Sequence, residues 1–342
     1  MATYQNIKGL RVKYLSSDPP SPREGEVWYN STTGTVKGYV LGLGSFSSGT
    51  SANTARDDIF GNVGTQTASL VGGGGAATPT GGTSNTETYD GSTWTEVNNR
   101  STSFFRVVNS GTQTAALGYG GYSPSAIPTA PTRYSISTEE WDGTNWTAGG
   151  NFPTGIQTAG GTGVQTASLQ ASGIYGPYSA PSPPRWKTEI NEYDGSSWSN
   201  GGAMPAGRDL SAVAGIQTAA IMVGGRGPGG TENLNAALYY DGSSWTAQPN
   251  YPISGHAIIG SGTQTAAIFA GGAAPTRTTN ANTWDGSAFS ATGSMSTARS
   301  GGVGGGTTTA ALVSTGATPG GASTAVEEYD AAVLGTKTLT TS

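Results

Sequence analysis

The chain has 342 residues, including 56 Gly, no Cys and a single His; only 11% of its residues are charged, and the formal net charge is −5. The lack of Cys excludes disulfides and thiolate chemistry, and one His excludes multi-histidine metal sites. Without clustered Lys and Arg, or an apolar run long enough for a signal peptide or a membrane span, we expect no nucleic-acid partner and no membrane insertion. We also expect no metal and no cofactor.

Residues 1–43 are unlike the rest of the chain. The segment 16–40, SSDPPSPREGEVWYNSTTGTVKGYV, contains a Pro-rich loop and then the pattern of a hairpin that turns at Thr33 and Gly34. An isolated hairpin is only marginally stable in water, so this arm is expected to dock on something, either the flank of the remaining chain or a partner. The candidate residues for attachment to a partner are Trp28, Tyr29 and Tyr39.

Two phrases then recur along the chain. The first is GTQTA followed by apolar residues and Gly-Gly, as at 64–73 and 262–272. The second is YDGSTW at 89–94, which returns in variant form at 141–146, 193–198, 240–245 and 284–289, and as a degenerate YDAAVL at 329–334. The copies begin 44 to 52 residues apart. Repetition at about this period is typical of solenoids, propellers and arrays.

Each repeat has the pattern of four short strands separated by turn residues, and the Asp-Gly pair is a strong hairpin signal. Four antiparallel strands in 40–50 residues are typical of a propeller blade. We therefore predict an all-β fold, with the short N-terminal arm at 1–43 and a six-bladed β-propeller of four-stranded antiparallel blades at 44–342. The recurring aromatic residues, such as Tyr89 and Trp94, are expected to pack between blades rather than to form a site.

The repeat resembles the kelch repeat at these residues over about 54–330. Kelch blades also carry an Arg before the first strand, a Gly-Gly after the second, and a Tyr and a Trp in the third and fourth. Arg56, Arg208 and Arg299 stand at the first of these positions. The fifth unit has Phe289 in place of the Trp, and the sixth lacks both the Asp-Gly turn and the Trp.

The incomplete sixth unit has a candidate fourth strand. GSFSSGTSANTAR at 44–56 matches GSAFSATGSMSTAR at 286–299, which places Phe46 where Phe289 stands. We predict that residues 44–50 complete the last blade and remove an exposed strand edge. The alternative is that VLGTKTLTT at 333–341 supplies this outer strand.

The connections between the second and third strands vary most in length and chemistry, and they should all emerge on one face. Tyr, Trp and Arg are frequent interface anchors. The candidate ligand-binding residues in these connections are Tyr122, Arg133, Tyr134, Tyr175, Tyr178, Arg185, Trp186, Arg226 and Arg277. The alternative is that the loops fold over the disc and their aromatic side chains cover it. His256 lies in YPISGHAIIG, at a first-strand position, and is expected to be packed rather than functional.

Catalysis is not expected. A kelch-type copper oxidase needs His ligands and a Cys-modified Tyr, and a sialidase-type propeller separates the Asp and Gly of its turns by one residue, whereas Asp90 and Gly91 are adjacent. A glycosidase needs one pair of carboxylates across a cleft, but most acids here repeat with the turns and so point to structure. A polysaccharide hydrolase remains the less favoured alternative.

GEVWYNSTTGTVKGYV is similar to a module near the N-termini of bacteriophage tail and other virion structural proteins. It is similar in particular to marine phage proteins that continue into kelch-like repeats of this kind. The resemblance implies a virion protein, made in the host cytoplasm, whose arm binds other virion proteins and whose loops bind a host-surface glycan or protein. A capsid decoration or tail-wall protein without receptor binding is the alternative, and a homo-oligomer is left open.

Overall fold

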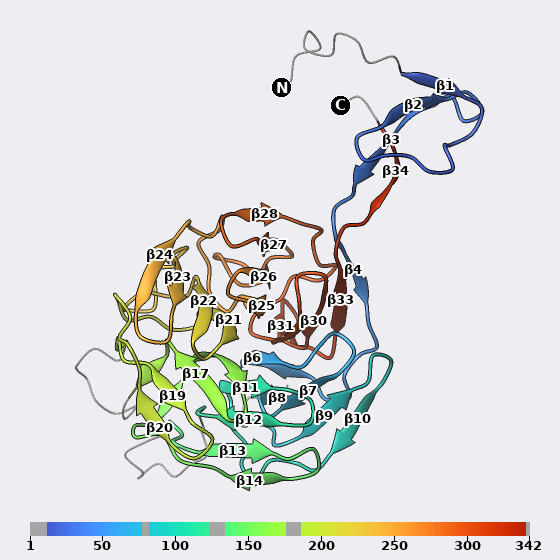
Figure 1. The fold of residues 1–342 in the computed structure, drawn as a ribbon. Helices are drawn as coiled ribbons and strands as arrows, with labels where there is room; N and C mark the ends of the chain where they lie inside the picture. Colours follow the sequence, from blue (N-terminus) through green and yellow to red (C-terminus); the bar gives the residue numbers. More distant parts are fainter. Residues whose placement is uncertain (1–11, 77–81, 123–133, 176–185, 340–342) are drawn as a thin grey trace. The chain divides into compact units, whose positions relative to one another are not determined.

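The computed structural model describes residues 12–76, 82–122, 134–175 and 186–339. These residues form strands and connecting loops, and no helix long and apolar enough to cross a membrane occurs among them. The chain divides into two compact units (Figure 1). One comprises the described residues up to Gly44 together with those from Ala331 onward, and the other comprises Ser45–Asp330. The sequence-based division had assigned the C-terminal residues to the repeat-containing part.

The first unit is one four-stranded sheet. Its strands, in spatial order, are β1 (Lys13–Leu15), β2 (Val27–Asn30), β3 (Thr35–Leu41) and β34 (Leu334–Thr338). The expected hairpin is present as β2 and β3, and β1 runs parallel to β2. The C-terminal strand β34 pairs antiparallel with β3. The alternative that residues 333–341 supply the outer strand of the last repeat is therefore wrong, because Leu334–Thr338 pair within this sheet and β4 takes the outer position in the last repeat.

The Asp18 carboxylate, in the loop between β1 and β2, ties that loop to strands β2 and β3. Asp18 Oδ1 accepts hydrogen bonds from Trp28 Nε1 at 3.0 Å and Asn30 Nδ2 at 2.8 Å, and Lys37 Nζ lies 2.9 Å from Asp18 Oδ2. The hydrogen bond from Lys37, followed by those from Asn30 and Trp28, lowers the pKa of Asp18 to about 2. The indole of Trp28 is fully buried. Asp18 thus accepts hydrogen bonds from the Trp28 and Asn30 side chains and balances the charge of Lys37 beside this small core.

Acid should loosen the first unit. Because the pKa of Asp18 is lower in the folded chain than its ordinary value, its stabilising effect is complete above about pH 4 and is lost as the pH falls through about 2. We expect exchange of the Trp28 indole proton, followed by NMR, to accelerate across that window. In Asp18→Asn, which keeps an oxygen acceptor without the charge, exchange should be faster at neutral pH and should lose this acid transition. A transition of unchanged size in Asp18→Asn would assign the effect to another group.

The second unit contains the repeats (Figure 1). By sequence, its described strands group into six sets of four; in five sets the four strands are hydrogen-bonded in order, whereas in the first set only the last three are. The first three sets are β6 (Ile59–Val63), β7 (Ser69–Gly72), β9 (Thr86–Tyr89) and β10 (Trp94–Val97); β11 (Val107–Gly111), β12 (Ala116–Tyr119), β13 (Thr138–Trp141) and β14 (Trp146–Ala148); and β16 (Gly160–Val164), β17 (Ala167–Ala171), β19 (Asn191–Tyr193) and β20 (Trp198–Asn200). The last three sets are β21 (Ala212–Ile216), β22 (Ala219–Val223), β23 (Ala237–Tyr240) and β24 (Trp245–Gln248); β25 (Ile259–Thr263), β26 (Ala266–Ala270), β27 (Ala281–Trp284) and β28 (Phe289–Ala291); and β29 (Val303–Gly306), β30 (Ala310–Ser314), β33 (Val326–Asp330) and β4 (Ser45–Ser48).

Short two-residue strands lie in the connections. They pair as β5 (Arg56–Asp57) with β8 (Gly75–Ala76), β15 (Ile156–Gln157) with β18 (Ile174–Tyr175), and β31 (Ala317–Thr318) with β32 (Gly321–Ala322). In the first two pairs, the segment before a first strand meets the connection between a second and a third strand. β31 and β32 both lie in one such connection, and there the isolated bridge of Ser300 to Ala317 makes the corresponding contact. Both kinds of connection therefore lie at the same end of the sheets.

The sixth set combines distant parts of the sequence. β4 pairs antiparallel with β33, and Phe46 lies opposite Tyr329, with ring centroids 5.0 Å apart. This is the pairing that the match of Phe46 to Phe289 predicts. It hydrogen-bonds the beginning of the second unit to its end and covers the edge of β33.

The first strands of the six sets contact one another in a ring. β6 contacts β11, β11 contacts β16, and the contacts continue through β21, β25 and β29 back to β6. β6 departs from the expected pattern, because it pairs in parallel with β11 and β29 and also contacts β16, β21 and β25. Gly61 permits this position, since a Cβ there would lie 1.9 Å from the Asn109 carbonyl oxygen.

The repeated phrases are braces between sets. In five sets, the side chain of the Gln in QTA donates through Nε2 to the backbone carbonyl of the aromatic residue in the neighbouring set. These bonds are Gln66 to Tyr329 at 3.0 Å, Gln113 to Tyr89 at 2.6 Å, and Gln165 to Trp141, Gln217 to Tyr193 and Gln264 to Tyr240, each at 2.7 Å. Tyr89 and Trp94 are buried, which confirms their structural role. In the sixth set Thr308 replaces the Gln.

The Gln side chains should contribute measurably to stability. We expect Gln217→Ala to lower the free energy of unfolding by about 1 kcal/mol, since it removes the donor of the Tyr193 carbonyl. Thr308→Gln should raise it by about 0.5–1 kcal/mol by offering the same brace to Trp284. Urea unfolding followed by tryptophan fluorescence measures both changes. If Gln217→Ala left the free energy of unfolding unchanged, water would replace this hydrogen bond without loss of stability.

Candidate functional site

In each set, a residue one or two positions before the first strand has a left-handed backbone. These residues, hereafter the left-handed ring, are Asp58 (φ 45°), Arg106 (58°), Thr158 (55°), Leu210 (55°), Ala257 (52°) and Gly301 (64°). Five are not Gly, and each such residue carries a conformational cost of about 1 kcal/mol or more. Conformations of this kind persist only where the surroundings enforce them, and they cluster at functional sites.

Backbone hydrogen bonds enforce the left-handed ring. Arg106 N–H donates to the Asp58 carbonyl at 2.6 Å, Leu210 to Thr158 at 2.9 Å, Ala257 to Leu210 at 2.8 Å and Gly301 to Ala257 at 2.8 Å. Ile59, which follows Asp58 in the sequence, donates through its N–H to the Gly301 carbonyl at 3.2 Å. These bonds therefore fix the backbone positions from which the side chains of the ring members extend.

A cavity of about 540 Å³ lies at the left-handed ring. Its lining combines ring members with residues from the connections between second and third strands: Asp58, Arg106, Leu210 and Ala257 from the ring, and Arg226, Ala273, Pro275, Arg277 and Pro319 from the connections or their ends. His256 and Ser300 also line it. The volume falls in the range of small-molecule sites, about 300–1,000 Å³.

Two of the cavity's guanidinium groups are held in place by acids. Arg226 forms a two-point pair with Asp209, from Nη2 to Oδ2 at 2.9 Å and from Nε to Oδ1 at 3.3 Å, and Asp209 is fully buried. Arg106 Nε lies 3.0 Å from Asp58 Oδ2, and its Nη1 donates to Gln157 Oε1 at 3.2 Å. Arg277 is exposed and forms no ion pair within the described part of the chain.

His256 has a fixed orientation at the cavity. Its Nδ1 lies 2.8 Å from Asn233 Oδ1, and the ring is half-buried. Burial, with the nearby charges of Arg226 and Arg277, lowers the pKa of His256. The imidazole is therefore neutral near pH 7, with the Nδ1 proton assigned toward Asn233 and Nε2 left as an acceptor. His256 was expected to be only packed, and the structure places it in the cavity lining.

The sequence-based ligand-binding residues do not all lie together. Arg226 and Arg277 meet at the cavity, whereas Tyr122 and Tyr134 form an edge-to-face pair with centroids 6.2 Å apart. Tyr175 is buried, and its hydroxyl donates to the Glu189 carbonyl at 2.9 Å. Trp186 is half-buried, and its backbone forms an isolated antiparallel β-bridge with Ile174. Arg133, Tyr178 and Arg185 fall outside the described residues.

Arg106 escaped the sequence-based reasoning, because SFFRVV carries no motif. A signal was available in the spacing, however. Arg106, Leu210 and Ala257 each stand seven residues before the Gln of the repeat, so an alignment anchored on that Gln brings the ring positions into register.

The arm residues proposed for attachment differ in accessibility. Trp28 is fully buried, so its indole supports the sheet of the first unit instead of facing a partner. Tyr29 and Tyr39 are partly exposed. Tyr29 lies against Tyr14, with ring centroids 5.1 Å apart, and Tyr14 is 74% exposed. An aromatic surface of the arm thus remains open around Tyr14 and Tyr29.

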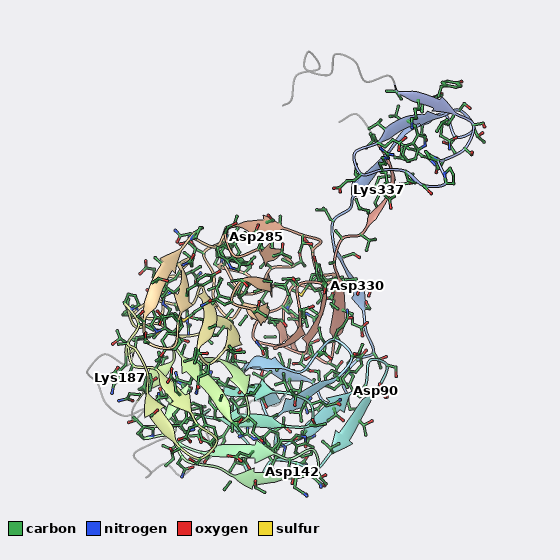
Figure 2. The ribbon with its side chains drawn as sticks, in the orientation of Figure 1. Asp90, Asp142, Lys187, Asp285, Asp330 and Lys337 are labelled. Carbon is green, nitrogen blue, oxygen red and sulfur yellow. The ribbon has the colours of Figure 1, made fainter. Side chains whose placement is uncertain are left out.

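The acids of the repeated turns cap hairpins at the rim of the second unit, where Figure 2 labels Asp90, Asp142 and Asp285. Asp90 Oδ1 accepts the backbone N–H groups of Ser92 at 2.8 Å and Thr93 at 2.7 Å. These hydrogen bonds lower the pKa of Asp90. A turn-capping role accounts for the repetition of this residue. Among the residues that the structure describes, no three His, Asp or Glu side chains are grouped to hold a metal ion.

Comparison with known proteins shows a likeness at the level of the fold. No family model matches the chain, and no curated protein matches it. The solved structure of YjhT is similar, with a TM-score of 0.64 and 14% sequence identity, and the match covers 82% of this chain and 96% of that chain. At this identity the likeness concerns the backbone arrangement and carries nothing about ligands or activity.

Proposed function

We propose that this chain is a bacteriophage virion protein that binds a host-surface glycan or protein without catalysis. In this proposal residues 45–330 fold as a closed, six-bladed, kelch-like β-propeller. The ring of contacts among the six first strands supports closure, as do the Gln66 bond to Tyr329 and the pairing of β4 with β33. The resemblance of the arm and the repeats to phage virion proteins supports the assignment to a particle.

The cavity at the left-handed ring carries the binding part of the proposal. Strained residues, oriented arginines and a volume suited to a small molecule coincide there, at the end of the sheets where the variable connections lie. The first unit would attach to other virion proteins through its aromatic surface around Tyr14 and Tyr29, and through Tyr39, which is also partly exposed.

The second candidate is a capsid decoration or tail-wall protein. The burial of Tyr134 and Tyr175 favours it, because these loop aromatics then cover their own sheets instead of facing a receptor. Antibody labelling of intact particles, viewed by electron microscopy, separates the two. We expect label at the tail tip or fibres, and label over the shell or along the tail would establish the second candidate. Absence from purified particles would overturn both.

A further inference from the structure

The cavity at the left-handed ring has a surplus of positive donors. The acids beside it are already engaged, Asp58 by Arg106 and Asp209 by Arg226. Arg277 has no such partner within the described residues, and neutral His256 adds no charge. Asp57, the remaining acid near Arg277, has a pKa raised by burial and forms no ion pair with it. An anionic group in the cavity would therefore supply the missing partner of Arg277.

The donors are prepared in place. The two-point pair with fully buried Asp209 holds Arg226, and contacts to Asp58 and Gln157 hold Arg106. Each guanidinium carries five N–H donors in a planar fork, so these contacts leave donors for a ligand. Planar oxyanions such as carboxylates suit that fork, and tetrahedral oxyanions such as sulfate do so as well.

The rest of the lining fits a sugar rather than a bare ion. His256 Nε2 is an acceptor, to which a sugar hydroxyl can donate but a fully deprotonated oxyanion such as sulfate cannot. Leu210, Ala257 and Pro275 provide apolar surface for the C–H faces of a pyranose ring. The exposed lining of the cavity is about equally polar and apolar, which suits a sugar, whose hydroxyl groups and C–H faces need both kinds of surface.

We propose that this cavity binds a saccharide bearing an acidic group, a carboxylate or a sulfate, with the anionic oxygens at Arg277, Arg226 and Arg106 and a hydroxyl at His256 Nε2. The inference deepens the proposed receptor-binding function and rests on it for its biological meaning. The binding itself is a property of the purified chain.

The test is saturation-transfer NMR and calorimetry on the full chain with matched sugars. Galacturonic acid is compared with galactose, and N-acetylglucosamine 6-sulfate with N-acetylglucosamine. We expect one acidic sugar of either pair to bind and its neutral counterpart not to bind, and the pair that responds identifies the anion. Arg277→Ala should weaken that binding about ten- to hundredfold, since one charge-assisted contact is lost.

Arg277 is exposed, so its replacement should leave the fold intact, and Lys187→Ala is the matched control. Lys187 is also an exposed cation of a second-to-third-strand connection but does not line this cavity. Equal binding of acidic and neutral sugars, no binding by either acidic sugar, or equal losses in the two variants would overturn the proposal. If acidic sugars bind but the protein is absent from particles, the cavity inference stands and the virion role fails.

Discussion

Replacing Arg299 with Met should lower the free energy of unfolding of the second unit by about 3–5 kcal/mol, because it strands a buried carboxylate. Arg299 is fully buried, and its Nη2 lies 2.6 Å from Glu327 Oε1. Its Nη1 also donates to the Ala325 carbonyl at 2.7 Å. Glu327, 1% exposed, would keep only the backbone N–H groups of Ser296 and Thr297. Guanidinium-induced unfolding, followed by tryptophan fluorescence, measures the loss.

The chain contains its own control for this prediction. Arg208 stands, like Arg299, two residues before a member of the left-handed ring, and it is also buried. The position that Glu327 occupies in the sixth set is Leu238 in the fourth, so Arg208 has no acid and burial alone lowers its pKa. Arg208→Met should therefore be neutral or stabilising, since it removes an uncompensated buried charge.

The double variant Arg299→Met with Glu327→Leu isolates the charge effect. It should recover much of the stability lost in Arg299→Met, because replacing a whole buried ion pair by apolar side chains is often tolerated. Equal losses for Arg208→Met and Arg299→Met would show that the two arginines contribute through packing of their stems, and the stranded-carboxylate argument would then be wrong.

Repetition made the strands of the second unit predictable. The Asp-Gly turns define hairpins such as β9 and β10, in which Trp94 pairs with Tyr89. The match of Phe46 to Phe289 predicted the pairing of β4 with β33, since it needed only a comparison of the chain with itself. The pairing of β34 with β3 had no such signal, because residues 333–341 resemble no other part of the chain and their partner is set by packing.

Only part of the candidate site, Arg226 and Arg277, could be predicted from the sequence. Arg226 and Arg277 were selected as variable loop residues, and the cavity brings them together. Asp209 holds Arg226, and the left-handed ring that lines the cavity beside it has members that share a backbone conformation but no side-chain type. Alignment on the repeat's Gln brings the ring positions into register, but only the structure shows their shared conformation, the place of Arg106 in the cavity and the acceptor role of His256.

Gly residues also allow strands to approach closely, and Gly304 tests this role. We expect Gly304→Ala to lower the free energy of unfolding by about 3 kcal/mol through overpacking. Gly304 lies in β29 opposite Asn62 of β6, and an added Cβ would lie 2.4 Å from the Gly260 carbonyl oxygen. That oxygen belongs to β25, so relief requires the strands to separate. Gly304 has no left-handed φ, so the loss would report the close approach of strands and not backbone strain.

Gly320→Ala is the matched control in the same unit, because the nearest atom to its added Cβ is Thr318 Oγ1 at 3.7 Å, an ordinary contact. It should change the free energy of unfolding by less than about 0.5 kcal/mol in the same denaturant titration. If Gly304→Ala were tolerated equally well, the first strands could not approach one another as closely as β6, β25 and β29 do. The abundance of Gly would then reflect turns alone and not the close approach of strands.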